Sequence, residues 1–468
     1  MISDKYQQLL KKYTEHGQEH VFKFFNEITE EEKKEFLTQL EEIDVERVVR
    51  IHRNLGAAKP LGKLEPIKDI NTLDDGEKVA DWEKVAYESI KKGEIAVITL
   101  AGGQGTRLGS SSPKGCYDIG LPSKKSLFQL QAERIIKLER LVNGIIPWYI
   151  MTSKPTHEET ENFFKSNNYF GKNPETIRFF QQGVLPCLTL EGKIMLASKS
   201  SVAVAPDGNG GIFASLLKTK TLEDMKSRGV KYIHAYCVDN CLVKVGDPAF
   251  IGSTIKSKVN CACKVVEKTE PTESVGVLCK SDGNFVVAEY SEVDKETTEL
   301  RDKDNKLVFN LANIANHVFS VNFLEEIDET GLGYHIAKKK IPTLDLETGQ
   351  SINPTSPNGM KLELFIFDVL KRANKLNTLL VDRSLEFSPL KNAPGSDTDS
   401  PETSRRDIMN LHKSFLRNAG AILENENAEC EISSLVSYNG EGLDGLKGKR
   451  ITLPLNLQSI DDLNKLLF

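Results

Sequence analysis

In the first part of the chain, apolar side chains recur at helical spacing among many charged ones. Leu9 and Tyr13 are four positions apart, which places them on one face of a helix. Thr29 stands three residues before Glu32, which is the capping-box pattern that starts a helix. The pattern predicts a helical N-terminal lobe over residues 1–92.

From residue 93 the pattern changes to short apolar runs that alternate with helical segments. A first set of runs, each long enough for a buried strand, covers residues 94–100, 145–151, 177–180 and 232–238. A second set, in which apolar residues alternate with polar ones, covers 262–266, 275–278, 285–290 and 314–321. Strands that alternate with helices predict an α/β fold of the Rossmann-like, doubly wound type with a mixed, mostly parallel sheet.

Capping patterns and apolar spacing predict further helices and the boundaries between parts of the chain. Ser126 and Thr156 each precede a glutamine or glutamate by three residues, so we expect them to cap helices. Apolar spacing predicts helices over 361–369 and 405–416, and the polar stretch 394–404 is expected to be mobile. We expect four parts: a helical lobe at 1–92, a main α/β domain at 93–392, a linker and helix at 393–419, and a small β-rich domain at 420–468.

Composition and charge narrow the class of protein. The 468 residues are 39% hydrophobic and 27% charged, which is typical of a globular protein. The net charge of −6 provides no basic excess for nucleic acid, so we expect no such partner. No signal peptide opens the chain and no apolar run reaches about 18 residues, so we expect no membrane segment and a cytoplasmic location.

The cysteines give no sign of a disulfide framework or a metal site. Eight cysteines are few for a chain of this length. Cys261-x-Cys263 and Cys237-x3-Cys241 lack the paired spacing of zinc ligands. We interpret Cys261 and Cys263 as neighbours on one face of a strand.

A glycine-rich loop after the first predicted strand is the main candidate for chemistry. The loop reads Ala-Gly-Gly-Gln-Gly-Thr-Arg over residues 101–107, and Pro-Lys-Gly follows at 113–115. A buried strand that leads into such a loop presents backbone N–H groups to an anion, and Arg107 and Lys114 add positive charge. The spacing fits neither the dinucleotide fingerprint, whose third glycine is replaced by Leu108, nor the Walker loop, in which lysine follows glycine.

Polar residues also follow the other predicted strands. Gln182 follows one strand, Asp239 follows another, and the turn 205–211 lies between them. Ligands of doubly wound sheets bind beyond the carboxyl ends of the strands, so we expect these segments to meet in one cleft. Asp239 is our candidate Mg²⁺ ligand, although an aspartate there can also cap a turn. Asp207 is interpreted as a turn residue.

The loop pattern L-x-G-G-x-G-T-R-[LM], followed by P-K, is the signature of sugar nucleotidyltransferases. With further blocks, the chain resembles the eukaryotic UDP-N-acetylhexosamine pyrophosphorylases, which include the UDP-N-acetylglucosamine enzymes, from the helical lobe to about residue 420. The blocks that carry this resemblance lie at residues 100–109, 113–118, 181–186, 205–211, 237–240, 313–317 and 387–392.

The resemblance implies the nucleotide-diphospho-sugar transferase fold and a reaction. Members of this family convert UTP and N-acetylglucosamine 1-phosphate into UDP-N-acetylglucosamine and pyrophosphate, with Mg²⁺ or Mn²⁺. Attack by an anionic phosphate oxygen needs no general base, so the chemistry depends on positioning and counter-charge. We expect a uridylyltransferase that is a monomer or a weak homodimer.

The resemblance and the loop chemistry together assign residues to three roles. The expected catalytic residues are Arg107, Lys114 and Lys391. The expected nucleotide-binding residues are Leu100, Ala101, Gly102, Gly103, Gln182, Gly208, Asp239 and Lys361, with Asp239 also the metal ligand. The expected sugar-binding residues are Asn209, Gly276, Glu289, Tyr290, Asn313, Phe365, Phe367 and Lys391.

Other interpretations stay open at this point. Arg107 and Lys114 could form surface salt bridges, and His317 is more simply a structural histidine. Phe365 and Phe367 are two positions apart, so they cannot share one face of the predicted helix. The same motifs would also suit a related enzyme that uses plain hexose 1-phosphates, or a nucleotide-sugar sensor without activity.

Overall fold

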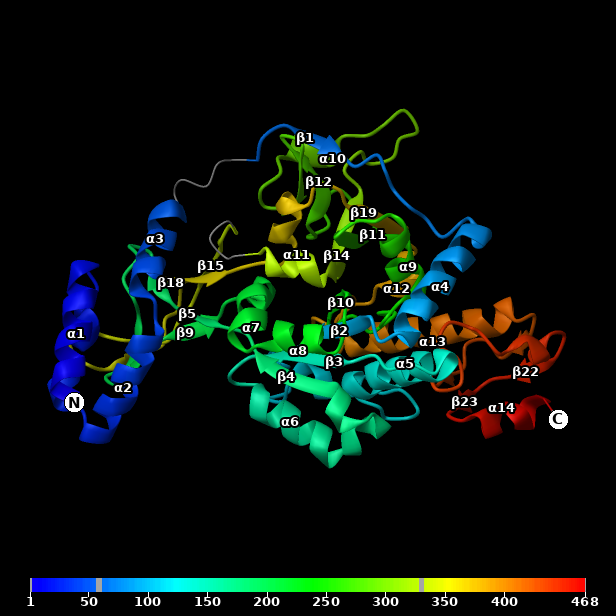
Figure 1. The fold of residues 1–468 in the computed structure, drawn as a ribbon, viewed down its shortest axis with the longest axis horizontal. Coiled ribbons are helices and arrows are strands. Elements are labelled where there is room, and N and C mark those ends of the chain that lie inside the picture. Colours follow the sequence, from blue (N-terminus) through cyan, green and yellow to red (C-terminus); the bar gives the residue numbers. More distant parts are fainter. Residues whose placement is uncertain (1, 56–60, 328–331, 468) are drawn as a thin grey trace. The chain divides into compact units, whose positions relative to one another are not determined.

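The computed structural model describes residues 2–55, 61–327 and 332–467 (Figure 1). The chain divides into two compact units, and each unit gathers segments that are far apart in the sequence. Unit 1 consists of Met1–Pro60, Gln182–Ala214 and Asp328–Asp368, and unit 2 of Leu61–Gln181, Ser215–Ile327 and Val369–Phe468. The expected boundaries at 92, 392 and 419 stay predictions about independent folding, since the compact units divide the chain differently.

Unit 2 is built on a ten-stranded mixed sheet, which confirms the expected α/β class. Its parallel part has the order β10-β2-β3-β4, and these strands match the first set of predicted runs. β2 and β3 are buried along their whole length, as expected for strands covered on both faces. The bounds are β2 (Ile95–Leu100), β3 (Trp148–Thr152), β4 (Ile177–Gln181) and β10 (Tyr232–Cys237).

The other part of the sheet is largely antiparallel. β14 pairs antiparallel with β10, with β11 and with β12, while β11 and β19 are parallel to each other. Cys261 and Cys263 are both buried on β11, as expected for one strand face. The bounds are β1 (Leu64–Pro66), β11 (Cys261–Glu267), β12 (Val277–Ser281), β13 (Asn284–Ala288), β14 (Leu311–Ser320) and β19 (Asn377–Val381).

Helices such as α5 and α9 flank this sheet (Figure 1). Ser126 accepts a hydrogen bond from Gln129 N at the start of α5, which confirms the predicted cap. The predicted cap at Thr156 is wrong, because its hydroxyl bonds Ser153 rather than the first turn of α6. The helices are α4 (Gly76–Lys91), α5 (Leu127–Val142), α6 (His157–Ser166), α7 (Ile212–Lys218), α8 (Thr221–Ser227), α9 (Pro248–Lys256), α10 (Lys295–Glu299), α11 (Val321–Glu325) and α12 (Arg383–Glu386).

The C-terminal part of unit 2 packs as one apolar cluster with its longest helix. α13 (Pro401–Asn418) begins four residues before the predicted start, because Ser400 and Thr403 form a capping box and Pro401 occupies the first turn. Two short parallel strand pairs follow, and a separate β-rich domain at 420–468 stays a prediction. They are β20 (Ile422–Glu424) with β22 (Arg450–Thr452), and β21 (Cys430–Ile432) with β23 (Leu455–Leu457), before α14 (Ile460–Leu467).

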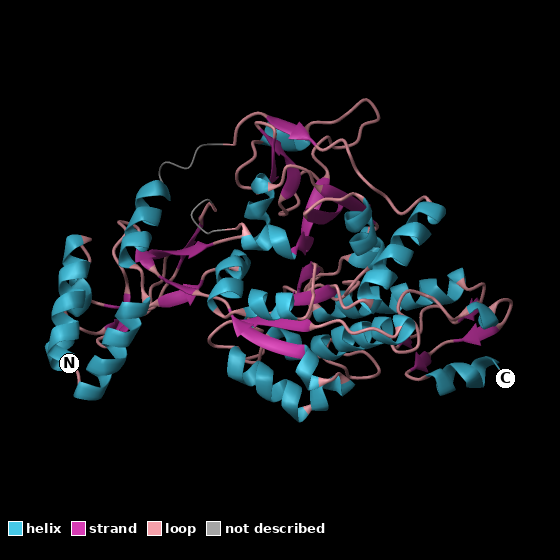
Figure 2. Cartoon of the chain, viewed as in Figure 1, coloured by secondary structure: helices cyan, strands magenta, loops and turns pink. Residues whose placement is uncertain are grey.

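Unit 1 packs three N-terminal helices against small sheets (Figure 2). The capping box at Thr29 and Glu32 is present at the start of α2, as predicted. The Tyr13 hydroxyl donates to Leu40 O inside this core. The helices are α1 (Ile2–Glu15), α2 (Glu30–Glu42) and α3 (Val45–Leu55); the strands are β5 (Val184–Pro186), β6 (Leu188–Thr189), β7 (Leu196–Ser198), β8 (Ser201–Val202), β9 (Val204–Pro206), β15 (His335–Lys339), β16 (Thr343–Leu344), β17 (Ser351–Ile352) and β18 (Gly359–Glu363).

The predicted helix over 361–369 is wrong. Residues 359–363 form β18, which pairs antiparallel with β15 on one side and with β6 on the other. Met360 and Leu362 are buried while Lys361 is only half-buried, so the burial follows the two-residue period of a strand. A 3₁₀ helix, η9 (Ile366–Arg372), follows. Pairing partners far away in the sequence decided the conformation here over local spacing.

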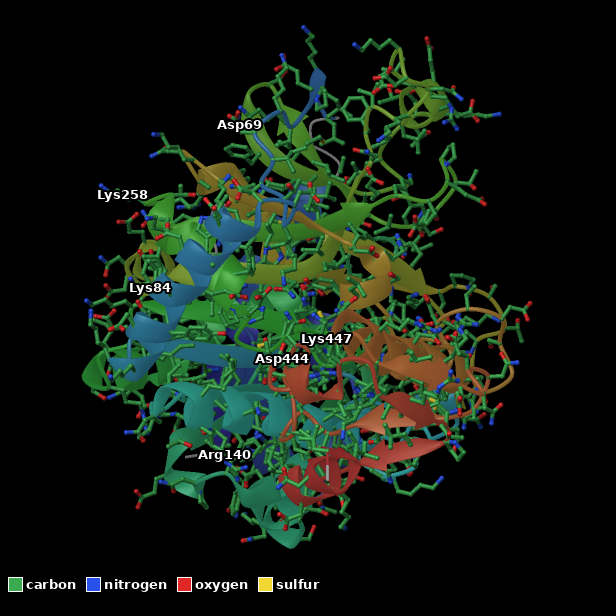
Figure 3. The ribbon with its side chains drawn as sticks, turned by 90° about the vertical axis from the view of Figure 1, so that its right-hand side faces the viewer. Asp69, Lys84, Arg140, Lys258, Asp444 and Lys447 are labelled. Carbon is green, nitrogen blue, oxygen red and sulfur yellow. The ribbon has the colours of Figure 1, made fainter. Side chains whose placement is uncertain are left out.

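The face of unit 2 in Figure 3 carries charges of both signs. The labelled side chains all lie exposed at its surface; they are Asp69, Lys84, Arg140, Lys258, Asp444 and Lys447. No helix among the described residues is both long and apolar enough to span a bilayer. Because positive and negative side chains are mixed on this surface, a ligand with several negative charges needs a local cluster of positively charged side chains to bind.

A buried ion cluster stabilises the interior of unit 2. Lys264 Nζ on β11 lies 2.5 Å from both Asp247 Oδ2 and Glu386 Oε2, and its side chain has no exposed surface. Burial acts to lower the pKa of Lys264, but the two carboxylates outweigh it and raise that pKa above the ordinary value. The cluster is therefore charged, and it joins β11 to α12.

Removing the central cation tests this interpretation. Lys264→Met removes the cation shared by the two buried carboxylates and leaves only Lys244, 3.3 Å from Glu386 Oε1, so it should lower the free energy of unfolding by about 3 kcal/mol. Lys256→Met removes an exposed partner of Asp81 and should change it by no more than about 1 kcal/mol. Equal effects of the two substitutions in urea denaturation would contradict a charged, buried cluster.

Candidate functional site

The glycine loop begins where β2 ends, and its first residues are tied to β3. Ala101 N donates to Met151 O at 2.8 Å, and Ser153 Oγ donates to Gly102 O at 2.7 Å. A Cβ on Gly103 would meet nothing within 4 Å, so open space lies beside the backbone there. The backbone is thus held by the Ala101 amide and the Gly102 carbonyl, with room for a ligand beside Gly103. Sequence reasoning missed Ser153, which stands outside every motif.

The loop then folds back on itself and delivers Lys114. Lys114 N donates to Gly103 O at 3.2 Å, and Gly105 N donates to Ser112 O at 3.0 Å. Gly109 has φ +74°, a left-handed conformation that glycine adopts without strain. Gly115 serves packing, because a Cβ there would lie 2.2 Å from the Phe128 ring.

Lys114 lies beside the carboxylate that follows β10. Its Nζ is 3.2 Å from Asp239 Oδ2 and 3.1 Å from Leu390 O. The two side chains are 17% and 22% exposed, so solvent or a ligand can reach the pair. The structure therefore brings together three sites predicted from separate parts of the sequence: the loop, the end of β10 and the segment that carries Lys391.

Lys391 and Arg107 are the two other expected catalytic cations. Leu390 N donates to Asp239 O at 2.8 Å, and Lys391 N donates to Asp399 O at 2.8 Å, so the backbone around Lys391 is fixed. The side chains of Lys391 and Arg107 are exposed. Within the part of the chain that the structure describes, no ion pair holds either of them. Both cations are thus accessible to an anionic ligand.

A second group in unit 2 contains residues expected to bind the sugar. Asn313 N donates to Gly276 O at 2.9 Å. A Cβ on Gly276 would lie 2.6 Å from Val287 and 2.7 Å from Glu289 Oε1, so a larger residue would displace these two side chains. Tyr290, the next residue after Glu289, is 53% exposed. The structure therefore places Gly276, Glu289 and Asn313 together, with Tyr290 adjacent.

An irregularity in the sheet shapes this group. The pairing of β11 with β14 shifts register next to Asn313, and Ala315 has φ +50°. Asn313 Oδ1 accepts from Ala315 N at 3.3 Å and from Cys263 Sγ at 3.4 Å. Such bulges commonly redirect a side chain near a binding site.

Unit 1 holds the remaining expected residues, and Gln182 is central among them. Its Nε2 donates to Gly208 O at 3.2 Å and to Asp207 Oδ1 at 3.4 Å. Because both partners are acceptors, the carboxamide is oriented and its oxygen faces the other way. Gly208 has φ +88°, and a Cβ there would lie 2.3 Å from Leu364 O.

The turn that contains Asn209 is joined to the segment that carries the two phenylalanines. Leu364 N donates to Asp207 O at 2.7 Å, and Gly210 N donates to Leu364 O at 2.8 Å. Asn209 Oδ1 accepts from Ile366 N at 2.8 Å. Lys361 lies on β18, which leads into this segment. These bonds place Asn209 beside the segment of Phe365 and Phe367.

The two phenylalanines pack against each other, contrary to the expectation that they face different ways. Their ring centroids are 5.1 Å apart, since residues 364–365 are not helical. The His335 ring lies 4.2 Å from that of Phe365, and its Nε2 is 3.1 Å from Asp368 Oδ1. Sequence reasoning missed His335 and Asp368, because no motif marks either residue.

The structure also bears on His317, on the expected cleft and on a metal site. His317 is fully buried on β14 beside Phe319, and burial lowers its pKa to about 3, so it is a neutral interior residue. The expected single cleft stays a prediction, because its residues belong to both compact units. Among the described residues, no three histidine, cysteine, aspartate or glutamate side chains gather as metal ligands.

The arrangement in unit 2 defines a class of protein. A glycine loop after a buried parallel strand, with a lysine and a carboxylate at the carboxyl edge of the sheet, is typical of nucleotide-binding α/β proteins. The model of the UTP–glucose-1-phosphate uridylyltransferase family matches residues 34–461. The chain belongs to this family, whose members are nucleotidyltransferases.

Individual relatives are similar over most of their length. The UDP-N-acetylglucosamine pyrophosphorylase of Saccharomyces cerevisiae is 51% identical, over 77% of this chain and 78% of the relative. The UDP-N-acetylglucosamine diphosphorylase 2 of Arabidopsis thaliana is 39% identical, over 97% and 94%. The solved structure of the Trypanosoma brucei UDP-N-acetylglucosamine pyrophosphorylase is 28% identical, with a TM-score of 0.83 over 96% of this chain and 98% of that chain.

Asp207 provides a test that needs no substrate. The carboxyl group is 5% exposed, and burial raises its pKa to about 6, against the opposing effect of the Gln182 hydrogen bond. Because folding raises the pKa of Asp207, the protonated carboxyl group stabilises the folded protein below about pH 4. This contribution to stability is lost as the pH rises through about 6. Ionised Asp207 therefore destabilises the folded protein at pH 7.

Asp207→Asn should raise the free energy of unfolding at pH 7 by about 1 to 3 kcal/mol. The difference from wild type should disappear near pH 4, where both side chains are neutral. Asp345→Asn is the control in unit 1, because its carboxylate has a lowered pKa through hydrogen bonds from Thr348 N and Glu347 N. Thermal denaturation at pH 7 and pH 4 measures both variants. The raised pKa of Asp207 would be contradicted if Asp345→Asn also raised the stability at pH 7, or if Asp207→Asn did not raise it there.

Proposed function

We propose that this protein transfers the uridylyl group of UTP to N-acetylglucosamine 1-phosphate. A phosphate oxygen of the sugar phosphate attacks the α-phosphorus of UTP, and the bond from that phosphorus to the bridging oxygen breaks. The products are UDP-N-acetylglucosamine and pyrophosphate. The position of Lys114 next to Asp239, beside the glycine loop, carries this proposal. It is supported by the 51% identity of this chain to the UDP-N-acetylglucosamine pyrophosphorylase of Saccharomyces cerevisiae, over 77% of this chain.

The main barrier to this reaction is repulsion between two anions, so the protein's part is counter-charge and alignment. Arg107 would bind the β- and γ-phosphates, since its planar guanidinium can make two parallel bonds. Lys114 would stabilise charge at the α-phosphate, and Lys391 would hold the phosphate of the sugar. Both Arg107 and Lys391 are exposed and can reach a ligand.

Asp239 fits a divalent cation that is held mainly by substrate. Mg²⁺ binds carboxylate and phosphate oxygens, keeps several waters, and needs few protein ligands, and Mn²⁺ has the same preference for oxygen. Asp239 is partly exposed at a strand end, and Lys114 already compensates its charge. When bound, the metal would supply further positive charge to the phosphates. The lysine would then turn to the phosphate, because both groups compete for the same carboxylate.

Residues in both units would recognise the substrates. We assign uridine to Leu100, Ala101, Gly102 and Gly103, because open space lies beside the backbone of Gly103. Gln182 would accept the uracil N–H through its outward carboxamide oxygen, next to Gly208, and Lys361 would add charge. In unit 2 we assign the sugar hydroxyls to Glu289 and Tyr290 and the acetamido group to Gly276 and Asn313. The sugar-binding roles expected of Asn209, Phe365 and Phe367 in unit 1 stay predictions.

The proposal extends to where and in what form the protein acts. All eight cysteines are free thiols, which suits a reducing compartment, and we propose the cytoplasm. A monomer or weak homodimer stays the prediction for the assembly. Light scattering over a range of protein concentrations tests it.

Pyrophosphate release from UTP tests the proposed function. With Mg²⁺, kcat/KM should be higher for N-acetylglucosamine 1-phosphate than for glucose 1-phosphate, since the acetamido residues would lose a partner with glucose. Equal or faster turnover of glucose 1-phosphate would point instead to a plain hexose enzyme. Calorimetric binding of UDP-N-acetylglucosamine without any turnover would point to a sensor.

Gly276→Ala tests the acetamido assignment. Its new Cβ would push against Val287 and Glu289, so the KM for N-acetylglucosamine 1-phosphate should rise about 10-fold or more while the KM for UTP changes little. Gly76→Ala is the control, because a Cβ there meets nothing within 4 Å. An unchanged KM for the sugar phosphate, or an equal rise for both substrates, would remove Gly276 from the sugar site.

A further inference from the structure

The segment from Glu386 to Lys391, called here the 386–391 segment, bears on two of the catalytic cations. It carries Lys391 at its end, and Leu390 O accepts the hydrogen bond from Lys114. Leu390 N in turn donates to Asp239 O. The position of this segment therefore sets where Lys391 lies relative to Lys114 and Asp239.

One buried side chain joins this segment to the end of β10. Asn240 is 3% exposed. Its Nδ2 donates to Glu386 O at 2.8 Å, and its Oδ1 accepts from Ser388 N at 3.0 Å. The same Oδ1 accepts from Leu242 N at 3.2 Å, within the turn of Asn240 itself. A single carboxamide thus bonds the backbone of the 386–391 segment at two points and its own turn at a third.

The segment makes further bonds to α13, to the buried lysine of β11 and, through its backbone, to the turn that follows β10. Ser388 Oγ donates to Asp407 Oδ2 on α13 at 2.8 Å, and the Glu386 carboxylate is held by Lys264. Cys241 N donates to Ser388 O at 2.9 Å. Asn240 is the side chain that connects the segment to the turn next to Asp239.

We propose that Asn240 is a positioning residue for the reaction, acting through the 386–391 segment. It keeps Lys391 and the Leu390 carbonyl aligned with Asp239 and Lys114, and it touches none of the reacting groups. The proposal rests on the function proposed above. Its physical basis is that a displacement of about 1 Å in a site that works by alignment can lower the rate 10²-fold.

The chemistry of the side chain explains why asparagine suits this place. The segment presents a carbonyl at Glu386 and an N–H at Ser388, so the side chain between them must both donate and accept. Aspartate could accept from Ser388 N but could not donate to Glu386 O. Alanine would leave both buried backbone groups without this partner.

Asn240→Ala is the first variant, and Asn377→Ala is its matched control. Asn377 is also 3% exposed in unit 2, and its Nδ2 donates to Ser253 Oγ and Thr254 Oγ1 while its Oδ1 accepts from Asn71 Nδ2. Both variants should lower the melting temperature. Asn240→Ala alone should lower kcat, by about 10-fold or more, with the KM for UTP changed less than about threefold.

A double-mutant cycle with Lys391→Ala separates positioning from general destabilisation. If Asn240 acts through Lys391, Asn240→Ala should lower kcat about 10-fold in wild type but less than about twofold in the Lys391→Ala background. The same loss in both backgrounds, or an unchanged kcat for Asn240→Ala, would overturn the proposal. A Lys391→Ala variant with the same kcat as wild type would also overturn the proposal.

The outcomes also distinguish this proposal from the proposed function. Absence of turnover in the wild-type protein contradicts the function itself. Normal turnover in wild type with no coupling between positions 240 and 391 contradicts only the role of Asn240. If Asn240→Ala does not fold, Asn240→Asp takes its place in the same cycle, because it keeps the acceptor and loses the donor; its kcat should fall, and an unchanged value overturns the proposal.

Discussion

The ion pair between Lys114 and Asp239 is the contact on which the proposed chemistry depends. It places a cation and a carboxylate at the carboxyl edge of the sheet, both still accessible to solvent. A protein with a net charge of −6 cannot attract phosphates through its surface as a whole. Positive charge must be concentrated locally, and Arg107, Lys391 and Lys114 supply it beside the glycine loop.

The rest of unit 2 holds this edge rigid. The parallel strands β10, β2 and β3 end together, so residues far apart in the sequence emerge side by side. Buried polar groups fix the segments beyond those ends: Ser153 holds the glycine loop, Asn240 holds the 386–391 segment, and Lys264 holds Glu386. Buried polar groups are costly unless they are paired, and here each pairing also fixes a catalytic segment.

Sequence patterns predicted the features that local physics controls. The buried strands, the caps at Thr29 and Ser126, and the glycine loop follow from spacing within a few residues. β18 and the packing of Phe365 against Phe367 were missed, because strand partners and an adjacent turn far away in the chain determine them. Ser153 and His335 each bond a residue distant in the sequence, and Asn240 bonds two, which no local pattern reveals.

The same distinction holds for the candidate site. Motif resemblance named Gly276, Glu289 and Asn313 separately, and the structure shows them together around one sheet irregularity. A crystal structure of the protein with UDP-N-acetylglucosamine and Mg²⁺ tests the central claim most directly. The account predicts the uracil beside the backbone of residues 100–103, the diphosphate near Lys114 and Asp239, and the acetamido group against Gly276 and Asn313. A product bound away from the glycine loop, or with its diphosphate remote from Lys114, would contradict it.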